Sequence, residues 1–228
     1  MKHTATFAAA AALSFGLPAA AQAQDAAGPV DVTVGVSAAT DYIWRGISQT
    51  DGKPAVFGTV QANVGNFYVG GGAENVDFGG IDTEYDLWAG YVLPIGKAKL
   101  DLGVVRYGYV DSAADIDTTE FKAALSGNVG KLGLGVAAYH TWNYFGSDEH
   151  ATYAEVNASY PLTDKLSASG AFGHQQIDNT PDYTTWNAGL SYEVLKGAKL
   201  DVRYHDTDTA AFGSLAKARV VGSFSLSF

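Results

Sequence analysis

Apolar and polar side chains alternate with a period of two residues along most of this chain. The alternation is clearest in residues 83–93 and 183–194, where every second side chain is apolar, aromatic or Thr. Successive side chains of a β-strand point to opposite sides, so this period predicts strands with one apolar face. We predict twelve strands, at residues 30–43, 54–64, 67–77, 83–93, 99–110, 118–129, 132–143, 151–160, 165–176, 183–194, 199–206 and 216–228.

The apolar stripes of the two clearest segments carry an aromatic residue near each end. Tyr85 and Tyr91 take these positions in one segment, and Trp186 and Tyr192 take them in the other. Aromatic side chains gather at the two interfaces of a lipid bilayer, where the ring meets hydrocarbon and its polar edge meets water. A soluble β-sandwich has no reason to place them this way, so the pattern favours a transmembrane barrel.

The predicted connections alternate between short and long. Five are tight and rich in Gly, Pro, Asn and Asp, which supply the backbone angles of hairpin turns, and they lie near residues 65–66, 94–98, 130–131, 162–164 and 195–198. Six are longer and polar, near residues 44–53, 78–82, 111–117, 144–150, 177–182 and 207–215. Short periplasmic turns and long external loops are typical of outer-membrane barrels. We therefore expect an all-β fold, a transmembrane antiparallel up-and-down β-barrel of about twelve strands.

The last predicted strand ends the sequence on an aromatic residue. Phe224, Leu226 and Phe228 share its apolar face, and serines lie between them. A closed barrel leaves no free edge only when its first and last strands pair. We assign these three residues to barrel assembly, and we expect a monomeric barrel.

The N-terminus has the features of a secretory signal peptide. Lys2 and His3 precede an Ala-rich apolar run, and the small-x-small sequence Ala21-Gln22-Ala23 follows it. The run is too short to span a membrane. We expect residues 1–23 to be a cleaved signal peptide, residues 24–29 to be a short N-terminal leader segment, and residues 30–228 to form the outer-membrane β-barrel as one domain.

Composition narrows the function classes. The expected signal peptide contains one lysine and no acid, so the mature chain would carry a net charge near −11, which argues against nucleic acid as a partner. The chain has no cysteine, so closure of the sheet must supply the stability that disulfides give many secreted domains. No segment after the leader contains 18 consecutive apolar residues, which excludes a helical membrane protein.

The two expected rims carry opposite charge. Six of the ten lysines lie at or beside the short turns, namely Lys97, Lys99, Lys131, Lys165, Lys196 and Lys199. Most acids fall in or next to the long loops, among them Asp111, Asp115, Asp117, Asp148, Glu149, Asp178, Asp182, Asp206 and Asp208. A ring of acids at the outer mouth would raise the local cation concentration, so we expect a modest cation preference.

A set of charged and polar residues shares the inward parity of the strands. The pore-lining candidates are Gln61, Glu74, Glu84, Asp86, Glu120, Lys122, Glu155, Asn187, Asp201, Arg203, Lys217 and Arg219, and Asp101 and Asn157 have the same parity. Burying so many charges in a dry core costs several kcal/mol per ion unless they are paired. Twelve strands lie between the filled eight-stranded barrel and the wide sixteen-stranded channel. The sequence thus leaves two interiors open: a narrow aqueous pore, or a sealed plug of ion-paired side chains.

Few residues suggest chemistry beyond this. His150 lies beside Asp148 and Glu149, but none of His140, His150, His174 and His205 sits in a recognisable nucleophile motif. The glycine strings at 69–73 and 130–135 lie in strand patterns and lead into no helix, so a phosphate-binding loop is not supported. We predict no catalytic residues, no metal and no cofactor.

Residues 40–78 resemble the signature of the TorF-like outer-membrane porin family. The matching positions are Asp41, Tyr42, Arg45, Gly46, Ser48, Gln49, Thr50, Pro54, Ala55, Asn75, Val76, Asp77 and Phe78. The resemblance covers about a sixth of the chain and implies an outer-membrane barrel that acts as a porin. It implies neither a substrate nor a catalytic site.

Together these features predict a porin for passive diffusion of small hydrophilic solutes in the cell outer membrane. Its expected partners are outer-membrane lipids and lipopolysaccharide, the barrel assembly machinery and the solutes themselves. Two alternatives stay open. An outer-membrane enzyme of lipase, deacylase or protease type would need catalytic residues clustered at one rim, and a structural or adhesin barrel would have a lumen closed by salt bridges.

Overall fold

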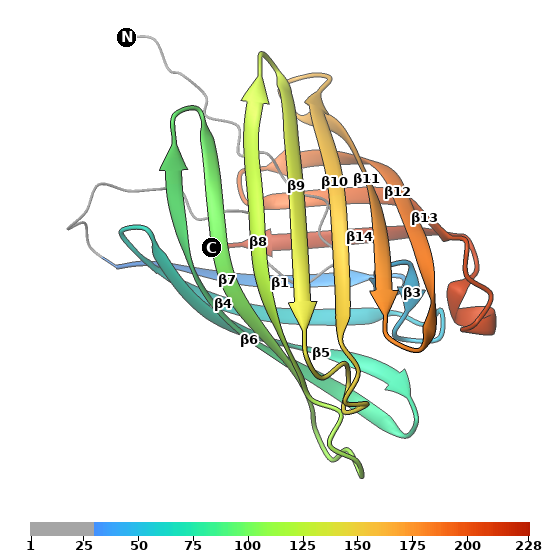
Figure 1. The fold of residues 1–228 in the computed structure, drawn as a ribbon. Coiled ribbons are helices and arrows are strands. Elements are labelled where there is room, and N and C mark those ends of the chain that lie inside the picture. The colour runs from blue at the N-terminus through green and yellow to red at the C-terminus, as the bar shows by residue number, and fades with distance from the viewer. Residues whose placement is uncertain (1–29) are drawn as a thin grey trace, which may run out of the picture.

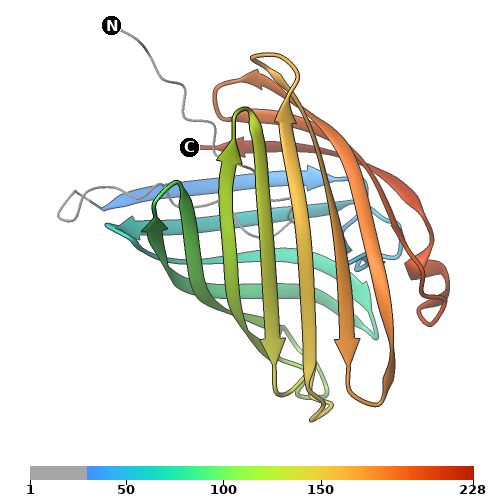
Figure 2. The same ribbon diagram turned by 45° about the horizontal axis from the view of Figure 1, so that its top comes forward.

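The computed structural model describes residues 30–228, and the expected signal peptide (1–23) and leader segment (24–29) lie outside these residues. Twelve antiparallel strands close into a barrel, each paired with its neighbours in the chain (Figures 1 and 2). No helix in residues 30–228 is long and apolar enough to cross a membrane. The wall strands are β1 (Asp31–Ala39), β4 (Ala55–Val64), β5 (Phe67–Phe78), β6 (Ile81–Ile95), β7 (Ala98–Tyr109), β8 (Thr118–Val129), β9 (Leu132–Thr141), β10 (Ala151–Pro161), β11 (Leu166–Ile177), β12 (Thr180–Leu195), β13 (Ala198–Thr207) and β14 (Arg219–Ser227).

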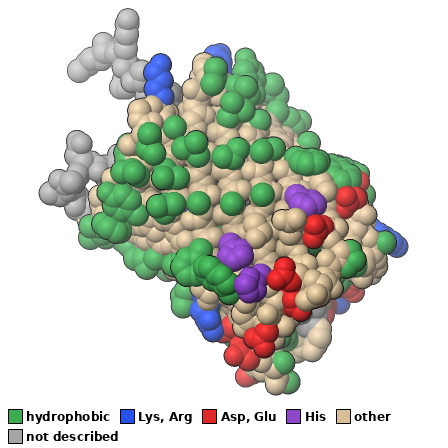
Figure 3. All heavy atoms as spheres, in the orientation of Figure 1, with side chains coloured by type: hydrophobic (Ala, Val, Ile, Leu, Met, Phe, Trp, Pro, Cys, Tyr) green, Lys and Arg blue, Asp and Glu red, His purple; other side chains and the backbone are tan. Residues whose placement is uncertain are grey.

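The barrel has its apolar face outside, as the alternation predicts. In β1, Val32, Val34 and Val36 are exposed on the outer wall, whereas Ala39 on the other face is buried. In β12, Tyr183 on the inner face is buried, while Leu190 on the outer face is exposed. Figure 3 shows hydrophobic side chains spread over the strands of the wall on the face in view. Such a surface suits lipid rather than water.

Pairing between β1 and β14 closes the barrel. Their register runs from Gly35 opposite Ser227 to Ala39 opposite Ser223. Beyond the strand, the backbone N–H of Phe228 donates to the carbonyl of Val34 at 2.9 Å, and Val34 donates back at 3.1 Å. The twelve-stranded closed fold predicted from the sequence is therefore confirmed, and the last residue takes part in the closing ladder.

The connections fall on two rims. We call the end with residues 65–66, 96–97, 130–131, 162–165 and 196–197 the turn rim, and the other end the loop rim. Two connections on the loop rim are shorter than the sequence predicts. The predicted loops at 78–82 and 177–182 are tight turns, because β5, β6, β11 and β12 extend further than their apolar pattern indicates. Positive φ angles of 61° at Gly79, 84° at Gly80 and 57° at Asn179 permit these turns.

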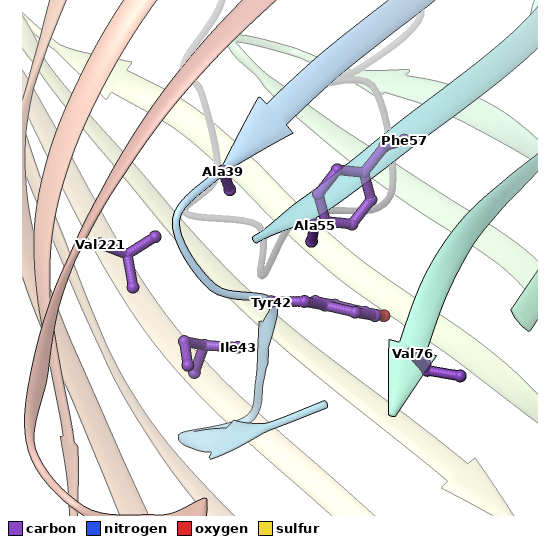
Figure 4. Close-up of a cluster of buried hydrophobic side chains, with 7 residues drawn as sticks. All are labelled: Ala39, Tyr42, Ile43, Ala55, Phe57, Val76 and Val221. Atoms are coloured by element: carbon purple, nitrogen blue, oxygen red, sulfur yellow. The ribbon is translucent and has the colours of Figure 1, made fainter. Parts of the chain in front are cut away.

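The connection between β1 and β4 folds into the barrel. The sequence predicts one strand over 30–43 and an external loop over 44–53. Instead, the chain leaves the wall after Ala39 and forms a short hairpin of β2 (Ile43–Trp44) and β3 (Ile47–Ser48). Figure 4 shows Tyr42 and Ile43 of this segment inside the wall, with Phe57, Val76 and Val221 from three wall strands around them. Burial of these apolar side chains favours the inward position over a solvated loop.

The connection between β13 and β14 contains the one helical turn of the described chain, η1 (Gly213–Ala216). Ala216 is buried with Ile47 of β3 and Tyr183 of β12. This loop therefore contacts the inward hairpin from the loop rim.

Candidate functional site: the barrel interior

The tip of the inward hairpin is the dipeptide Arg45-Gly46. Both residues have positive φ, 46° at Arg45 and 82° at Gly46, as two-residue hairpin turns require. A Cβ on Gly46 would lie 2.6 Å from Oγ1 of Thr185 and 3.1 Å from Cβ of Thr207. These threonines belong to β12 and β13, so the tip touches the inner wall and only glycine fits there.

Arg45 binds the wall from inside the barrel. Its guanidinium donates to both carboxylate oxygens of Glu120, at 2.8 and 2.5 Å, and to Oε1 of Gln175 at 2.9 Å. The side chains of Arg45 and Glu120 are only 4% and 1% exposed. The same guanidinium lies over the rings of Trp44 and Tyr153, at 4.2 and 4.4 Å from their centroids. One side chain thus connects the hairpin with β8, β10 and β11.

Asp41 holds the stem of the hairpin. Its Oδ1 accepts hydrogen bonds from the hydroxyls of Ser48 at 2.7 Å and Thr50 at 2.9 Å, and its Oδ2 pairs with Arg219 of β14. The Thr50 hydroxyl also accepts from the backbone N–H of Tyr42 at 3.1 Å. The two arms of the stem are therefore joined through one carboxylate, which is itself fixed to the wall.

The exit of the segment is fixed to β5. The side-chain amide of Asn75 donates to the carbonyl of Pro54 at 3.1 Å, and its oxygen accepts from the N–H of Val56 at 2.8 Å. Lys53 pairs with Asp77 on the surface, and the Asp77 carboxylate raises the pKa of the Lys53 ammonium above its usual value.

Most residues of the stretch at 40–78 that resembles TorF-like porins therefore share one structural role. The backbone N–H of Gln49 donates to the carbonyl of Tyr42, and the N–H of Asp77 donates to the carbonyl of Gln49, both at 2.7 Å. Phe78 is the last residue of β5. The sequence singled out these positions by resemblance, and the structure shows that they build and anchor the inward hairpin.

The bases of the interior are paired with acids. Lys122 binds Asp101 at 2.7 Å. Arg203 binds Asp201 at 3.0 Å and also donates to Oδ1 of Asn187 at 2.9 Å. The Arg219 guanidinium binds Asp41, as described above.

Other predicted pore-lining residues also have partners within the wall. Gln61 accepts a hydrogen bond from the indole N–H of Trp88 at 2.8 Å, and Glu155 accepts from the hydroxyl of Tyr153 at 3.0 Å. Lys217 differs from the rest, because it lies in the loop after η1 and is exposed. The alternation predicts a strand from residue 216 and thus an inward Lys217, but β14 begins only at Arg219. Whether the others contact a passing solute stays a prediction.

Three acids form a cluster that the sequence does not single out. Glu74 of β5 and Glu84 of β6 are opposite each other in the register, and Asp86 follows two residues along β6. One carboxylate oxygen from each lies within 4.8 Å of the others, a separation that would allow all three to bind one ion. Inward parity was the only signal in the sequence, because the register between β5 and β6 decides which acids meet.

A pocket lies towards the turn rim. A cavity of about 950 Å³ is lined there by the polar side chains of Ser126, Asn157 and Asn187 and by small residues such as Gly135. Its lining also includes apolar residues of the outer face, among them Val156. The hairpin and its aromatic neighbours thus occupy the loop-rim half of the interior.

Two of the histidines lie beside threonine hydroxyls, and Nε2 of His174 also lies 3.7 Å from Oδ2 of Asp182. Nδ1 of His140 lies 2.9 Å from the hydroxyl of Thr152, and Nδ1 of His174 lies 3.3 Å from that of Thr184. His205 of β13 faces the barrel interior and is buried, as the alternation along this strand predicts.

Comparisons with known proteins agree with the fold. Residues 23–224 match the model of a family described as "Bacterial protein of unknown function (Gcw_chp)". No protein with curated annotation matches the chain.

Solved outer-membrane porins share the architecture. The KdgM porin in complex with disordered oligogalacturonate is 11% identical, with a TM-score of 0.61 over 86% of this chain and 99% of that one. The NanC porin is 10% identical, with a TM-score of 0.59 over 87% and 99%. The COG4313 outer membrane channel from Pseudomonas putida F1 is 12% identical, with a TM-score of 0.55 over 92% and 100%. At these identities the likeness shows the barrel fold alone.

Proposed function

We propose that this chain, which belongs to the Gcw_chp family of bacterial proteins of unknown function, is an outer-membrane channel for small hydrophilic solutes. The observation that carries the proposal is a polar, charged interior enclosed by a wall whose outer face is apolar. A soluble protein has the opposite arrangement, because water selects polar outer surfaces. The fold shared with porins and the resemblance of residues 40–78 to TorF-like porins support the same function.

The passage of solutes through the barrel would be restricted where the inward hairpin fills part of the interior. Trp44 and Arg45 extend from the hairpin into the interior, and Tyr107 and Phe145 pack around the Trp44 ring with centroids at 5.9 and 5.6 Å. A solute that crosses the barrel must pass beside this group. We therefore propose a narrow pore that admits small solutes by passive diffusion and performs no catalysis.

We further propose a modest cation preference. The loop-rim acids would concentrate cations at the outer mouth, and Figure 3 shows Asp and Glu side chains gathered towards that end of the molecule. The inner bases Lys122, Arg203 and Arg219 oppose this effect only weakly, because each is paired with an acid. An acidic sugar such as the oligogalacturonate of the KdgM complex is then a poor candidate solute for this chain.

The proposed location is the cell outer membrane, reached with the expected signal peptide and the barrel assembly machinery. Outer-membrane lipids would contact the apolar wall, and loop-rim acids could bind divalent ions that bridge to lipopolysaccharide phosphates. We propose that the barrel acts as a monomer, since β1 and β14 close it within one chain.

Conductance in planar lipid bilayers tests the channel. We expect discrete conductance steps from the purified protein and larger steps from the variant W44A/R45A, which shortens the two side chains at the hairpin tip. The matched control W142A/R106A removes the same two residue types at partly exposed positions and should leave the step size unchanged. Both variants must show the heat-modifiable gel mobility of a folded barrel. Absence of steps over repeated insertions of folded wild type would contradict the proposal.

Absence of conductance steps would favour a structural barrel, which is the second function that the interior supports. The ion pairs and the hairpin would then seal the lumen. An enzyme would instead show hydrolysis of lipid, acyl or peptide substrates by the folded protein, with activity that maps to one rim.

The sign of the reversal potential across a KCl gradient tests the selectivity. We expect a cation-selective sign that weakens as salt rises, because screening shortens the reach of fixed charges to about 10 Å at 0.1 M. The variant D115N/E149Q removes two loop-rim acids and should reduce the preference. An anion-selective wild type would mean that the inner bases control passage.

A further inference from the structure

The acid cluster of Glu74, Glu84 and Asp86 is buried on the inner face of β5 and β6. Their relative exposures are 5%, 2% and 3%, although all three are carboxylic acids. Glu74 lies opposite Phe57 of β4, whose ring packs edge-on against Tyr42 in the stem of the hairpin, with centroids 5.2 Å apart. The cluster therefore lies beside the anchor of the inward hairpin.

These acids have no basic partner in residues 30–228. The structure contains seven ion pairs within the described chain, and none includes a member of the cluster. Arg45, the buried base of the hairpin, is bound to Glu120 instead. The hydroxyl of Tyr109 donates to Oε1 of Glu84 at 3.3 Å, which satisfies one oxygen of the group.

One buried oxygen of each acid is without a hydrogen-bond partner. These atoms are Oε1 of Glu74, Oε2 of Glu84 and Oδ1 of Asp86. Buried polar atoms are almost always satisfied, so three unsatisfied oxygens of adjacent carboxyl groups indicate an absent partner. Ionised carboxylates only accept hydrogen bonds and repel one another, so a divalent cation bound between the three groups would satisfy all three oxygens at once.

The spacing fits calcium. Calcium binds six to eight oxygen ligands at about 2.3–2.6 Å, so two ligands on opposite sides of the ion are at most about 5 Å apart. The ligand oxygens here lie within 4.8 Å of one another. Magnesium dehydrates reluctantly and usually keeps several waters, which three buried carboxylates would have to displace. Carboxylate oxygens are also the ligands that hard divalent cations prefer.

We propose that Glu74, Glu84 and Asp86 form a buried binding site for one Ca²⁺ ion on the inner face of β5 and β6. The two positive charges of the ion offset most of the charge of the three carboxylates, and the ion ties β5 to β6 beside the hairpin stem. The test of this site is independent of whether the barrel conducts, because it measures ion binding to the folded barrel and not passage through it.

Binding to the purified, folded barrel tests the site. After treatment with EDTA, calorimetric titration with CaCl₂ should show one site per chain. Terbium should occupy the same site and emit when tyrosine is excited, since the Tyr109 hydroxyl contacts Glu84. We expect E84Q/D86N to lose at least about tenfold in calcium affinity and to lose the terbium emission, because it removes two anionic ligands.

The control variant D115N/E149Q removes one Asp and one Glu from the loop rim and should bind calcium as wild type does. Folding of each variant is checked by heat-modifiable mobility in EDTA, where E84Q/D86N should be at least as stable as wild type because it removes buried like charges. If wild type binds neither ion at one site per chain, the proposal is wrong and the carboxyl groups share protons instead. Equal loss of binding in both double variants would also overturn it, because the ions would then bind the rim.

Discussion

At the scale of single residues, Arg45 anchors the inward hairpin to the barrel wall. Its sequence neighbours suggest a loop residue, yet its guanidinium makes three hydrogen bonds to wall strands and is almost fully buried. A buried ion pair contributes little net stability, but removing one partner leaves the other charge without compensation. The consequence should be measurable.

Replacement of Arg45 by Met should destabilise the barrel by about 3–5 kcal/mol, the range for breaking a buried pair. The double variant R45M/E120Q should recover part of this loss because it also removes the orphaned carboxylate. Arg106→Met breaks a half-exposed pair with Asp117 and should cost at most about 1 kcal/mol. Guanidinium unfolding in detergent micelles, followed by tryptophan fluorescence, measures all three. Equal losses for Arg45 and Arg106 would contradict the buried role of Arg45.

Gly46 is the second residue that the hairpin tip requires. Its φ of 82° is a backbone conformation that residues with a side chain rarely adopt. In addition, a Cβ at this position would lie only 2.6 Å from Oγ1 of Thr185. We expect Gly46→Val to destabilise the barrel by about 1–3 kcal/mol, the usual cost of a strained backbone position. Gly58 has no atom within 4 Å of its Cβ position, so Gly58→Ala should have little effect. The same unfolding assay compares them, and a neutral Gly46→Val would show that the tip does not touch the wall.

At the scale of elements, β14 has the role of closing the barrel. Its ladder with β1 continues to the last residue through the two backbone hydrogen bonds between Val34 and Phe228. Without this ladder, two strand edges would lie in the bilayer, where lipid hydrocarbon offers no hydrogen-bond partners to their backbone N–H and C=O groups.

Deletion of Phe228 should therefore impair assembly, and fewer molecules should show heat-modifiable mobility after expression in cells. Phe228→Tyr keeps the aromatic end and the backbone hydrogen bonds, so it should assemble as wild type does. Normal insertion of the truncated chain would mean that the register up to Ser227 is enough for closure.

At the scale of the whole molecule, the apolar outer wall should make stability depend on depth in the bilayer. Val156 lies at the middle of β10 and Val129 at the turn-rim end of β8, and both are exposed. Arginine on the lipid face costs about 2–4 kcal/mol at the bilayer midplane and about 0–1 kcal/mol near an interface. We expect Val156→Arg to destabilise the barrel much more than Val129→Arg in reversible unfolding from lipid bilayers. Equal effects would contradict the assignment of the outer wall to lipid.

The sequence predicted some parts of the interior and missed others. The inward parity of Gln61, Glu120 and Arg203 follows from the alternation, because a strand with an apolar outer face leaves its polar residues inside. The pairing of Lys122 with Asp101 could not be predicted, since it depends on the register of neighbouring strands. The exposed position of Lys217 was missed because the start of a strand is poorly marked by alternation alone.

What the sequence by itself determined is the architecture. Period-two alternation and turn residues predict a closed barrel of twelve strands, because these patterns act locally or between neighbouring strands. Only the tertiary structure decided where residues 40–53 lie. An external loop and an inward hairpin have the same local pattern, and the choice depends on contacts of Arg45 and Asp41 with strands far away in the chain. The meeting of Glu74, Glu84 and Asp86 was decided in the same way, by the register of β5 and β6.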